Sequence, residues 1–455
     1  MKKSVNLMLY NAFNTKIDKF IKNPTKYTFD LKSRLLRQAY NEKNCFIIWF
    51  LVSFFINLLF FLIFFKSSDK IDTASLFAIT SLLITILARN HTVNSILFEI
   101  IGAKGKYYVF HQLSNSIGYL HKMMAISALV WFSVHLSYAL EKVPATYLSI
   151  GVNLLILFII IIGTSLAYFR RKYHNTFENI HRYFGYIAIF LLTIYYLQIN
   201  FVLGYNLLDT LHKPQFILIC IIVLLLVTPW IGTKRIYPKI VHTAPHVIGI
   251  EISGKPSFGT YSKITLANGY YHPFGDSMIN FNDLKNRTLY ITPAGDRTKK
   301  IVKDLNKGNH TLSKCSIKKQ RNKGFMYNHS VYDHVLIIVT GGGIAPIIPC
   351  MVLNKKTKMD VIWIGRAQDK EFSSELLSKL TQSISNQEIG LHILDTTSDE
   401  LKGFKTDNYI NLALKAVKHY NPEAVFVMSN QKFTIDMTYA LKKIGIKTYG
   451  ANFDS

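Results

Sequence analysis

The sequence predicts an α-helical membrane bundle followed by a cytoplasmic module with two β-containing domains. Six apolar runs near membrane-spanning length precede residue 234. Short alternating segments separated by turns then predict an antiparallel β-barrel. After about residue 331, apolar strands alternate with helical patterns, which predicts a doubly wound α/β domain. We therefore divide the chain into a basic segment (1–44), a six-helix domain (45–233), a barrel (234–330) and an α/β domain (331–455).

The chain is strongly basic, with 53 Lys+Arg against 27 Asp+Glu and a net charge of +26. Residues 1–44 alone carry ten Lys/Arg against three acids. Excess positive charge beside apolar spans favours contact with anionic lipid at the cytoplasmic surface. Because no nucleic-acid-binding motif accompanies the charge, we expect a lipid bilayer and no nucleic acid as partner.

The apolar runs predict six spans with both termini in the cytoplasm. The second and fifth runs are the weakest. The connections 141–146 and 204–214 carry one lysine each, whereas basic clusters follow the fourth and sixth runs, so the positive-inside rule orients the bundle. We expect no cleavable signal peptide, because the first run begins only after some 44 mostly polar residues. The runs cover residues 45–65, 72–89, 118–140, 147–169, 184–203 and 215–233.

Three strands and one motif define the expected barrel. The strands are HVIGIEIS (246–253), YSKITLA (261–267) and TLYITPA (288–294). The motif HPFGDS, which follows the turn Asn268-Gly269, resembles the His-Pro-Phe-Ser/Thr flavin motif of the ferric reductase and NADPH oxidase superfamily. This resemblance implies that His272, Pro273 and Phe274 seat a flavin ring. Gly275 stands at the hydroxyl position, so Ser277 or the backbone would supply that contact. The alternative is a turn with an aromatic plug.

The segment GDRTKKIVKDL, from Gly295, predicts a helix whose N-terminus receives a pyrophosphate. Backbone N–H groups and the helix dipole favour an anion at that end, and Arg297 and Thr298 would lie at the phosphates. The alternative is an ordinary capped helix. Its position 23 residues after the HPF motif favours the flavin interpretation.

The segment VLIIVTGGGIAPIIP (335–349) predicts a strand, a glycine loop and a helix. Glycines let the backbone approach a phosphate, so Gly341, Gly342, Gly343 and Pro346 are expected to form a nucleotide loop. The segment resembles the nicotinamide loop of ferredoxin reductases; the alternative is a structural βα turn. Arg366 follows the next expected strand and could contact the 2′-phosphate of NADPH. The further strands expected are DVIWIG (360–365), GLHILDT (390–396) and AVFVMS (424–429).

Several segments together resemble the TmpA-type integral membrane flavoproteins of fungi, relatives of ferric reductases that also occur fused to adenylating enzymes. They are HNTFENIHRYFGY (174–186), GDRT, TGGGIAP, LDTT, AVFVMSN and the terminal GANFDS. The resemblance implies a ferredoxin-reductase-like module that binds FAD and NAD(P)H. Two departures make the nicotinamide cofactor less secure than the flavin. Met428-Ser429-Asn430 replaces the usual Cys-Gly-Pro turn, and Phe453 is not the last residue.

Histidines in two spans are candidate haem ligands. Within the superfamily, two histidine pairs bridge the third and fifth spans and hold two haems. The resemblance implies that His121 and His181, at matching depth near the cytoplasmic helix ends, could ligate one haem b. A partner for His135 belongs 13 or 14 residues after His181, where Ile194 and Tyr195 stand. We therefore expect at most one haem; a haem-free polar site or a structural role are the alternatives.

The leading hypothesis is a membrane flavin oxidoreductase that passes electrons from NAD(P)H through FAD to an acceptor in or beside the bundle. The acceptor would be a small or lipid-like molecule. A second hypothesis is a haem-free flavoenzyme that acts directly on a lipid-like or tethered metabolite. A third is a membrane scaffold or sensor that has lost turnover. The oligomeric state is left open.

Overall fold

A computed structural model describes most of the chain. The described residues are 34–103, 108–265, 271–281, 284–293, 295–307, 315–319, 321–385 and 387–451. Most of the basic segment 1–44, the turn Asn268-Gly269 and the end from Phe453 lie outside this range. The chain forms two compact units. The first, which we call the bundle, comprises Asn44–Val93 and Ser116–Ile231. The second, which we call the two-sheet unit, comprises the described residues of Asn94–Asn115, those from Gly232 onward, and Arg34–Lys43.

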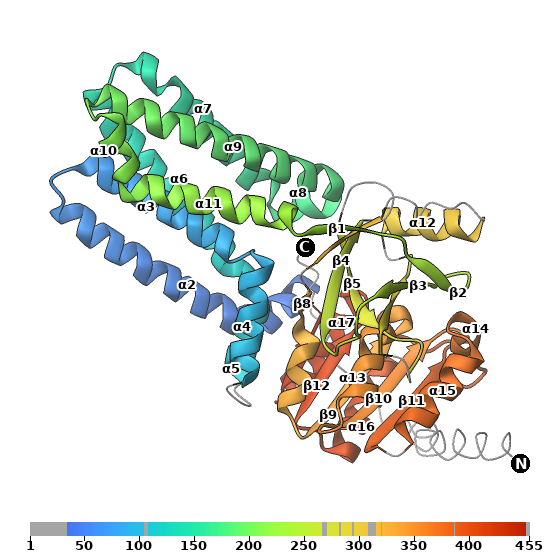
Figure 1. Cartoon of the computed structure of the whole chain (residues 1–455). Helices are drawn as coiled ribbons and strands as arrows, with labels where there is room; N and C mark the ends of the chain where they lie inside the picture. The colour runs from blue at the N-terminus through green and yellow to red at the C-terminus, as the bar shows by residue number, and fades with distance from the viewer. Residues whose placement is uncertain are drawn as a thin grey trace, which may run out of the picture. The chain divides into compact units, whose positions relative to one another are not determined.

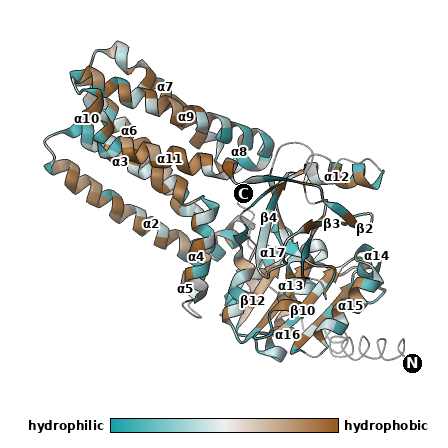
Figure 2. Cartoon of the chain, in the orientation of Figure 1, coloured by the Kyte–Doolittle hydropathy of each residue, from teal (hydrophilic) through white to brown (hydrophobic). Residues whose placement is uncertain are grey.

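The bundle is built from apolar helices (Figures 1 and 2). Each of the six expected runs lies mostly within a helix. Among the described residues, five helices are long and apolar enough to cross a membrane, and Pro214–Thr228 of α11 is counted with the shorter apolar helices. By length and composition, the described part of the chain therefore shows five candidate spans and does not show the sixth that we expected. The helices of this part of the chain are α2 (Arg34–Lys66), α3 (Lys70–Leu87), α6 (Gly118–Lys142), α7 (Ala145–Thr164), α8 (Ala167–Lys172), α9 (His174–Val202), α10 (Leu207–His212) and α11 (Pro214–Ile231).

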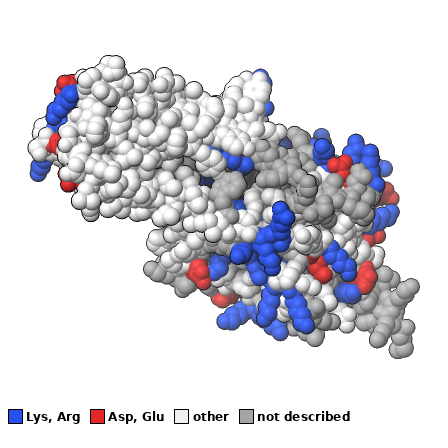
Figure 3. Space-filling view, turned by 45° about the horizontal axis from the view of Figure 1, so that its top comes forward, with Lys and Arg blue, Asp and Glu red and all other residues white. Residues whose placement is uncertain are grey.

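Aromatic and polar contacts hold α2 to its neighbours. Phe60 of α2 stacks on Phe77 of α3 with ring centres 4.2 Å apart. The side-chain oxygen of Asn57 accepts hydrogen bonds from Ser127 and Trp131 of α6, at 2.6 and 3.0 Å. The outer faces of these helices are apolar. In the view of Figure 3 the middle of the bundle shows no charged side chain, while charges gather at its tip. Exposed apolar surface of this extent suits lipid.

The first sheet of the two-sheet unit is an antiparallel half-barrel. Its strand order is β1-β7-β4-β5-β6-β3-β2, with β8 paired to β4. Isoleucine and leucine side chains fill its interior together with one face of α12 (Asp296–Asn306). The strands are β1 (Thr233–Ile236), β2 (Lys239–Thr243), β3 (Ile248–Ser253), β4 (Thr260–Thr265), β5 (Tyr271–Ser277), β6 (Asn286–Ile291), β7 (Cys315–Lys318) and β8 (Asn322–Lys323).

The second sheet is parallel, with strand order β11-β10-β9-β12-β13. Helices α13 and α15 pack on one face and α16 and α17 on the other, so the domain is doubly wound (Figure 1). The elements are η2 (Phe325–Val331), β9 (His334–Thr340), η3 (Gly341–Ile347), α13 (Ile348–Leu353), β10 (Lys358–Gly365), α14 (Gln368–Glu371), α15 (Ser374–Ile384), β11 (Ile389–Asp395), α16 (Thr406–Tyr420), β12 (Ala424–Met428), α17 (Gln431–Lys443) and β13 (Thr448–Gly450).

The structure differs from the expectation in two places. The motif HPFGDS, expected just after a turn, forms most of strand β5. Residues 94–115, expected within the helical membrane domain, form most of α4 (His91–Ala103) and all of α5 (Tyr108–Asn115), and they belong to the two-sheet unit. The reason is that α5 is short and polar enough to pack on a soluble domain.

Candidate functional site

The glycine loop lies at the switch point of the parallel sheet. Strands β9 and β12 are neighbours, and the chain leaves them toward opposite faces, so a crevice opens beyond their carboxyl ends. Gly341 begins the loop with φ +50°, and no atom lies within 4 Å of the position that a Cβ would take. Its carbonyl accepts a hydrogen bond of 2.9 Å from the Trp363 indole. Gly341 therefore offers open backbone to a ligand.

The other two glycines of the loop serve packing. A Cβ on Gly342 would collide with the Thr292 side chain, and one on Gly343 would lie 3.0 Å from the Met428 carbonyl oxygen. Both residues let the loop approach neighbouring strands closely. The structure thus divides the expected phosphate loop into one open glycine and two packed ones.

Strand β5, which carries the HPFGDS motif, is in direct contact with the glycine loop. A Cβ on Gly275 would lie 2.6 Å from Cβ of Pro346, so no side chain fits at this position. This close approach accounts for the glycine at position 275. Pro273 is exposed, and Phe274 packs against the half-barrel core, 6.5 Å from the His272 ring.

Ser277 is fully buried, and its hydroxyl is enclosed by protein without a hydrogen-bond partner among the described residues. The neighbouring Asp276, which sequence reasoning missed, organises a buried polar network. Its carboxylate accepts hydrogen bonds from Ser262 at 2.7 Å and Thr260 at 2.8 Å, and lies 3.5 Å from Arg287. Burial lowers the pKa of Arg287, although Asp276 opposes that shift. These contacts anchor the carboxyl-terminal end of β5, directly after the HPFG part of the motif.

The segment GDRT forms the N-terminus of α12, as expected. The Gly295 N–H donates to the Thr298 hydroxyl at 2.9 Å, and that hydroxyl donates back to the Gly295 carbonyl at 3.0 Å. Thr298 therefore shapes the turn through bonds that it already makes. Apart from its neighbours in the chain, no described atom lies within 4 Å of a Cβ position on Gly295, so this side of the turn has room for an anion. The side chain of Arg297 lies outside the described part of the structure.

Two strand ends meet beside the glycine loop. The hydroxyl groups of Thr340 and Ser429 are hydrogen-bonded at 2.6 Å, which joins the ends of β9 and β12. The Asn430 side chain accepts from the Phe433 N–H at 3.0 Å and caps α17. Ser429 and Asn430, noted in the sequence only as a departure from Cys-Gly-Pro, are thus structural members of the site.

Arg366 is exposed at the carboxyl end of β10. The next residue, Ala367, has φ +43°, and its N–H donates to the Asp395 carboxylate at 3.0 Å. Burial raises the pKa of Asp395, but hydrogen bonds from Thr397 and Ala367 bring it below the ordinary value. Asp395 therefore holds the turn that presents Arg366 to solvent.

Within the bundle, the structure brings His121 and His181 together. Their ring centres are 6.1 Å apart. Nδ1 of His121 is 2.8 Å from the Thr85 carbonyl oxygen, whereas Nδ1 of His181 is buried without a hydrogen-bond partner among the described residues. Two imidazoles that ligate one metal ion from opposite sides at about 2.0 Å have ring centres roughly 6 Å apart. The spacing of this pair therefore fits shared ligation.

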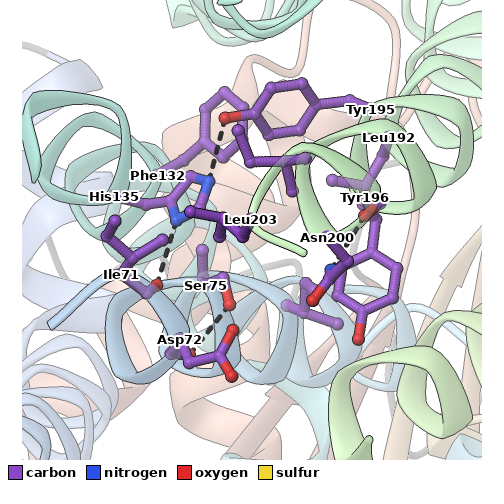
Figure 4. Close-up of a pocket in the computed structure, with 13 residues that line it drawn as sticks. Ile71, Asp72, Ser75, Phe132, His135, Leu192, Tyr195, Tyr196, Asn200 and Leu203 are labelled. Atoms are coloured by element: carbon purple, nitrogen blue, oxygen red, sulfur yellow. Dashed lines mark hydrogen bonds between the residues drawn. The ribbon is translucent and has the colours of Figure 1, made fainter. Parts of the chain in front are cut away.

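His135 is bonded through both nitrogens (Figure 4). Nδ1 lies 3.0 Å from the Ile71 carbonyl oxygen and Nε2 lies 2.9 Å from the Tyr195 hydroxyl. Because a carbonyl only accepts, Nδ1 carries the proton and Nε2 accepts from Tyr195. Of the two residues that the spacing placed opposite His135, Ile194 and Tyr195, the structure shows Tyr195 in contact with it. Gly151 makes room for it, since a Cβ there would be 2.7 Å from the tyrosine ring.

A small pocket adjoins this pair, with a polar rim that sequence reasoning missed (Figure 4). Lys213 forms an ion pair with Asp72 at 2.6 Å and donates to the Asn200 side chain at 2.8 Å. The described residues contain no group of three or more His, Cys, Asp or Glu side chains arranged to hold a metal ion. The pocket is lined by Ile71, Asp72, Ser75, Ala78, Ile79, Phe132, His135, Leu192, Tyr195, Tyr196, Ile199, Asn200 and Leu203.

Residues 325–455 match the family model of the C-terminal domain of adenylate-forming reductase 03009. Two curated proteins of Coprinopsis cinerea are similar over a longer region. Adenylate-forming reductase 03009 is 27% identical over 74% of this chain, and adenylate-forming reductase 06235 is 26% identical over 75%. The matched region spans only 32% and 33% of those proteins. Their names agree with the expectation of relatives fused to adenylating enzymes.

Solved structures align weakly. A flavohemoglobin from Malassezia yamatoensis with bound FAD and heme gives a TM-score of 0.39 at 14% identity, covering 83% of this chain and 98% of its own. A ferredoxin-NADP+ reductase from Plasmodium falciparum gives 0.34 at 13% identity, covering 48% and 94%. Scores below 0.5 do not establish a shared fold, so the architecture above rests on the strand order of this chain.

Proposed function

We propose that this protein is a membrane flavin oxidoreductase that takes electrons from NAD(P)H and passes them through FAD to an acceptor in or beside the bundle. One observation carries the proposal: the contact between Gly275 and Pro346 joins the flavin-like strand to the glycine loop at the switch point. Hydride transfer needs a flavin and a nicotinamide held face to face, and we propose that these two segments hold them. The names of the curated relatives agree with reductase chemistry.

FAD fits the residues that are present. Gly295 offers an open helix N-terminus for the pyrophosphate, and Gly341 offers a second open backbone turn for the nicotinamide phosphates. His272, Pro273 and Phe274 lie on β5 and would flank the flavin ring. Bound FAD supplies the exchange between two-electron and one-electron chemistry. Arg366 would favour NADPH through its 2′-phosphate.

One haem fits His121 and His181 by the spacing of their rings. When bound, a haem there supplies a one-electron acceptor near the end of the bundle that we expect to be cytoplasmic. At the depth of His135 no haem is expected, because both nitrogens of this histidine are already hydrogen-bonded. The proposed acceptor therefore lies within the bundle or on the cytoplasmic side, in a membrane protein with both termini in the cytoplasm.

A second candidate is a haem-free flavoenzyme that reduces or oxidises a lipid-like or tethered metabolite directly. The closed His135–Tyr195 level and the relatives named as adenylate-forming enzymes favour it. A scaffold without turnover is a weaker third candidate, motivated by Met428-Ser429-Asn430 in place of Cys-Gly-Pro.

An absorbance spectrum of the full chain, purified in mild detergent, separates the three candidates. Flavin and Soret bands together support the first, flavin bands alone support the second, and a colourless protein supports the scaffold. FAD-loaded protein should also reduce ferricyanide with NADPH or NADH. Wild-type protein that holds FAD but oxidises neither nucleotide would contradict the oxidoreductase proposal.

The variant Arg297→Ala tests the flavin site. A charge-assisted bond to phosphate contributes roughly 1.5–3 kcal/mol, so we expect FAD affinity to fall about ten- to a hundredfold. Lys303→Ala, which removes a positive charge near the other end of α12, is the matched control and should retain FAD. Equal FAD content in both variants would remove the helix N-terminus from the site.

A further inference from the structure

Residues 34–43 at the start of α2 pack on α17 of the nucleotide-binding sheet. Arg37 lies 3.0 Å from Asp436, and their side chains are only 10% and 5% exposed. A pair this deeply buried differs from a surface salt bridge, because removal of one partner leaves an uncompensated charge in the interior. Arg37 is therefore committed to α17.

Further contacts extend this attachment along the helix. The Asn41 side chain donates to the Ile435 carbonyl at 3.1 Å, and the Asn41 carbonyl accepts from Lys442 at 2.9 Å. The ring of Tyr40 meets Tyr439 edge to face, with centres 5.2 Å apart. Residues 34–43 thus contact α17 over about two turns.

Helix α5 covers the free edge of the same sheet. Strand β13 is the last in the order, so its outer backbone groups need partners. The Thr448 carbonyl accepts hydrogen bonds from the Tyr108 hydroxyl at 3.0 Å and the Gln112 amide at 3.3 Å. Gln112 also accepts from Lys442 at 3.4 Å, which links this cover to α17.

Helix α17 in turn holds the nucleotide loop. Thr434, in its first turn, donates to the Ser429 carbonyl at 3.2 Å, and the Ser429 hydroxyl is bonded to Thr340 directly before Gly341. The path from Arg37 to the loop consequently runs through one helix and two hydroxyl bonds. A shift of α17 moves Ser429 and, with it, the entrance of the loop.

We infer that the Arg37–Asp436 pair is a positioning pair for the nicotinamide nucleotide: residues 34–43 fix α17 so that Ser429 and Thr340 hold the glycine loop open to NAD(P)H. The inference rests on the proposed function, because it names what sets nucleotide affinity at that site. It distinguishes these residues from the flavin site, which lies on the half-barrel and on α12.

The test uses the full chain in detergent with ferricyanide as acceptor. Arg37→Gln and Asp436→Asn should each raise the KM for the preferred nucleotide about tenfold. FAD content and kcat at saturating nucleotide should stay at wild-type levels. Lys66→Gln, which removes an exposed positive charge from the other end of the same helix, is the matched control and should leave KM unchanged.

Other outcomes overturn the inference or its premise. A merely structural pair would lower FAD content and thermal stability with KM unchanged in the remaining active protein. If the single variants unfold, Arg37→Met combined with Asp436→Leu removes both charges while keeping apolar volume. Unchanged KM in that folded double variant also overturns the inference. Wild-type protein without NAD(P)H oxidation overturns the proposed function instead.

Discussion

Two levels of helix α6 hold a histidine in different ways. At one level, His121 bonds the Thr85 carbonyl through Nδ1 and faces His181 with ring centres 6.1 Å apart. At the other, His135 is satisfied by the Ile71 carbonyl and the Tyr195 hydroxyl. The difference lies in what α9 presents: a second imidazole in one case and a phenol in the other. A single residue on the facing helix thus decides whether a buried histidine keeps a nitrogen for a ligand.

Haem content should show the largest contrast between the two levels. His121→Leu and His181→Leu should each lose all haem, because either change would remove one of the two side chains proposed to hold it. His135→Leu and Tyr195→Phe should keep the wild-type amount. A pyridine haemochrome assay, normalised to protein, measures this. Two haems per chain, or loss of haem in His135→Leu, would contradict the closed level.

Absence of haem from a fully flavinated and active wild type has a separate meaning. The two histidine levels would then not differ in haem binding. That result would favour the haem-free flavoenzyme that acts directly on a metabolite, with His121 and His181 as polar residues of the bundle.

His329, which lies outside the bundle, resembles His135 because both of its ring nitrogens are hydrogen-bonded. Its Nδ1 bonds the Met326 carbonyl and its Nε2 accepts from Asn354, at 2.5 and 2.8 Å. Burial lowers the pKa of His329 to about 4, although the bond to Met326 opposes the shift. Protonation therefore favours the unfolded chain. The stability gained from the neutral ring is fully present above about pH 6.5 and is lost as pH falls toward 4, by roughly 3 kcal/mol.

Denaturant unfolding between pH 7.5 and 4, followed by tryptophan fluorescence, measures that loss. His329→Gln should be less stable at pH 7.5 but should lose less stability on acidification. An identical pH slope in the two proteins would show that His329 is not the titrating group.

The bond between Tyr195 and His135 should have a moderate energetic effect. Tyr195→Phe removes the donor and leaves Nε2 of a buried imidazole without a partner, which costs about 1–3 kcal/mol. Thermal unfolding of the detergent-solubilised chain should register the loss. The double variant His135→Leu with Tyr195→Phe removes both polar groups and should recover part of it. Purely additive losses would mean that the two side chains act independently.

The smallest expected effect is on nucleotide affinity, at Arg366. As in the bundle, one group is already hydrogen-bonded within the protein and its neighbour is exposed to solvent. Asp395 is committed to the turn, whereas Arg366 is exposed. Arg366→Ala should raise the KM for NADPH about fivefold, equivalent to about 1 kcal/mol, with little change for NADH. Equal losses for both nucleotides would end its assignment to the 2′-phosphate. Lys370→Ala is the neighbouring charge control.

Local patterns predicted much of this molecule. The expected strand at 424–429 became β12 (Ala424–Met428), and helical depth narrowed the residue opposite His135 to Ile194 or Tyr195, of which the structure shows Tyr195. Contacts between distant segments were not predictable. Position 342 needs glycine because Thr292, fifty residues earlier, occupies the space of a side chain there. Arg37 forms its ion pair with Asp436, near the other end of the chain. Such pairs leave no spacing signal in a single sequence, because nothing local determines which side chains meet.

The contact between Gly275 and Pro346 also limits how this chain can change. A serine at position 275 would restore the hydroxyl of related flavin motifs, yet its Cβ would have to displace the proline ring. Only glycine at position 346 lacks the Cβ atom that lies nearest, because every other residue keeps that atom. The two positions are therefore expected to be strongly non-additive, with a side chain at 275 tolerated only after position 346 has become glycine.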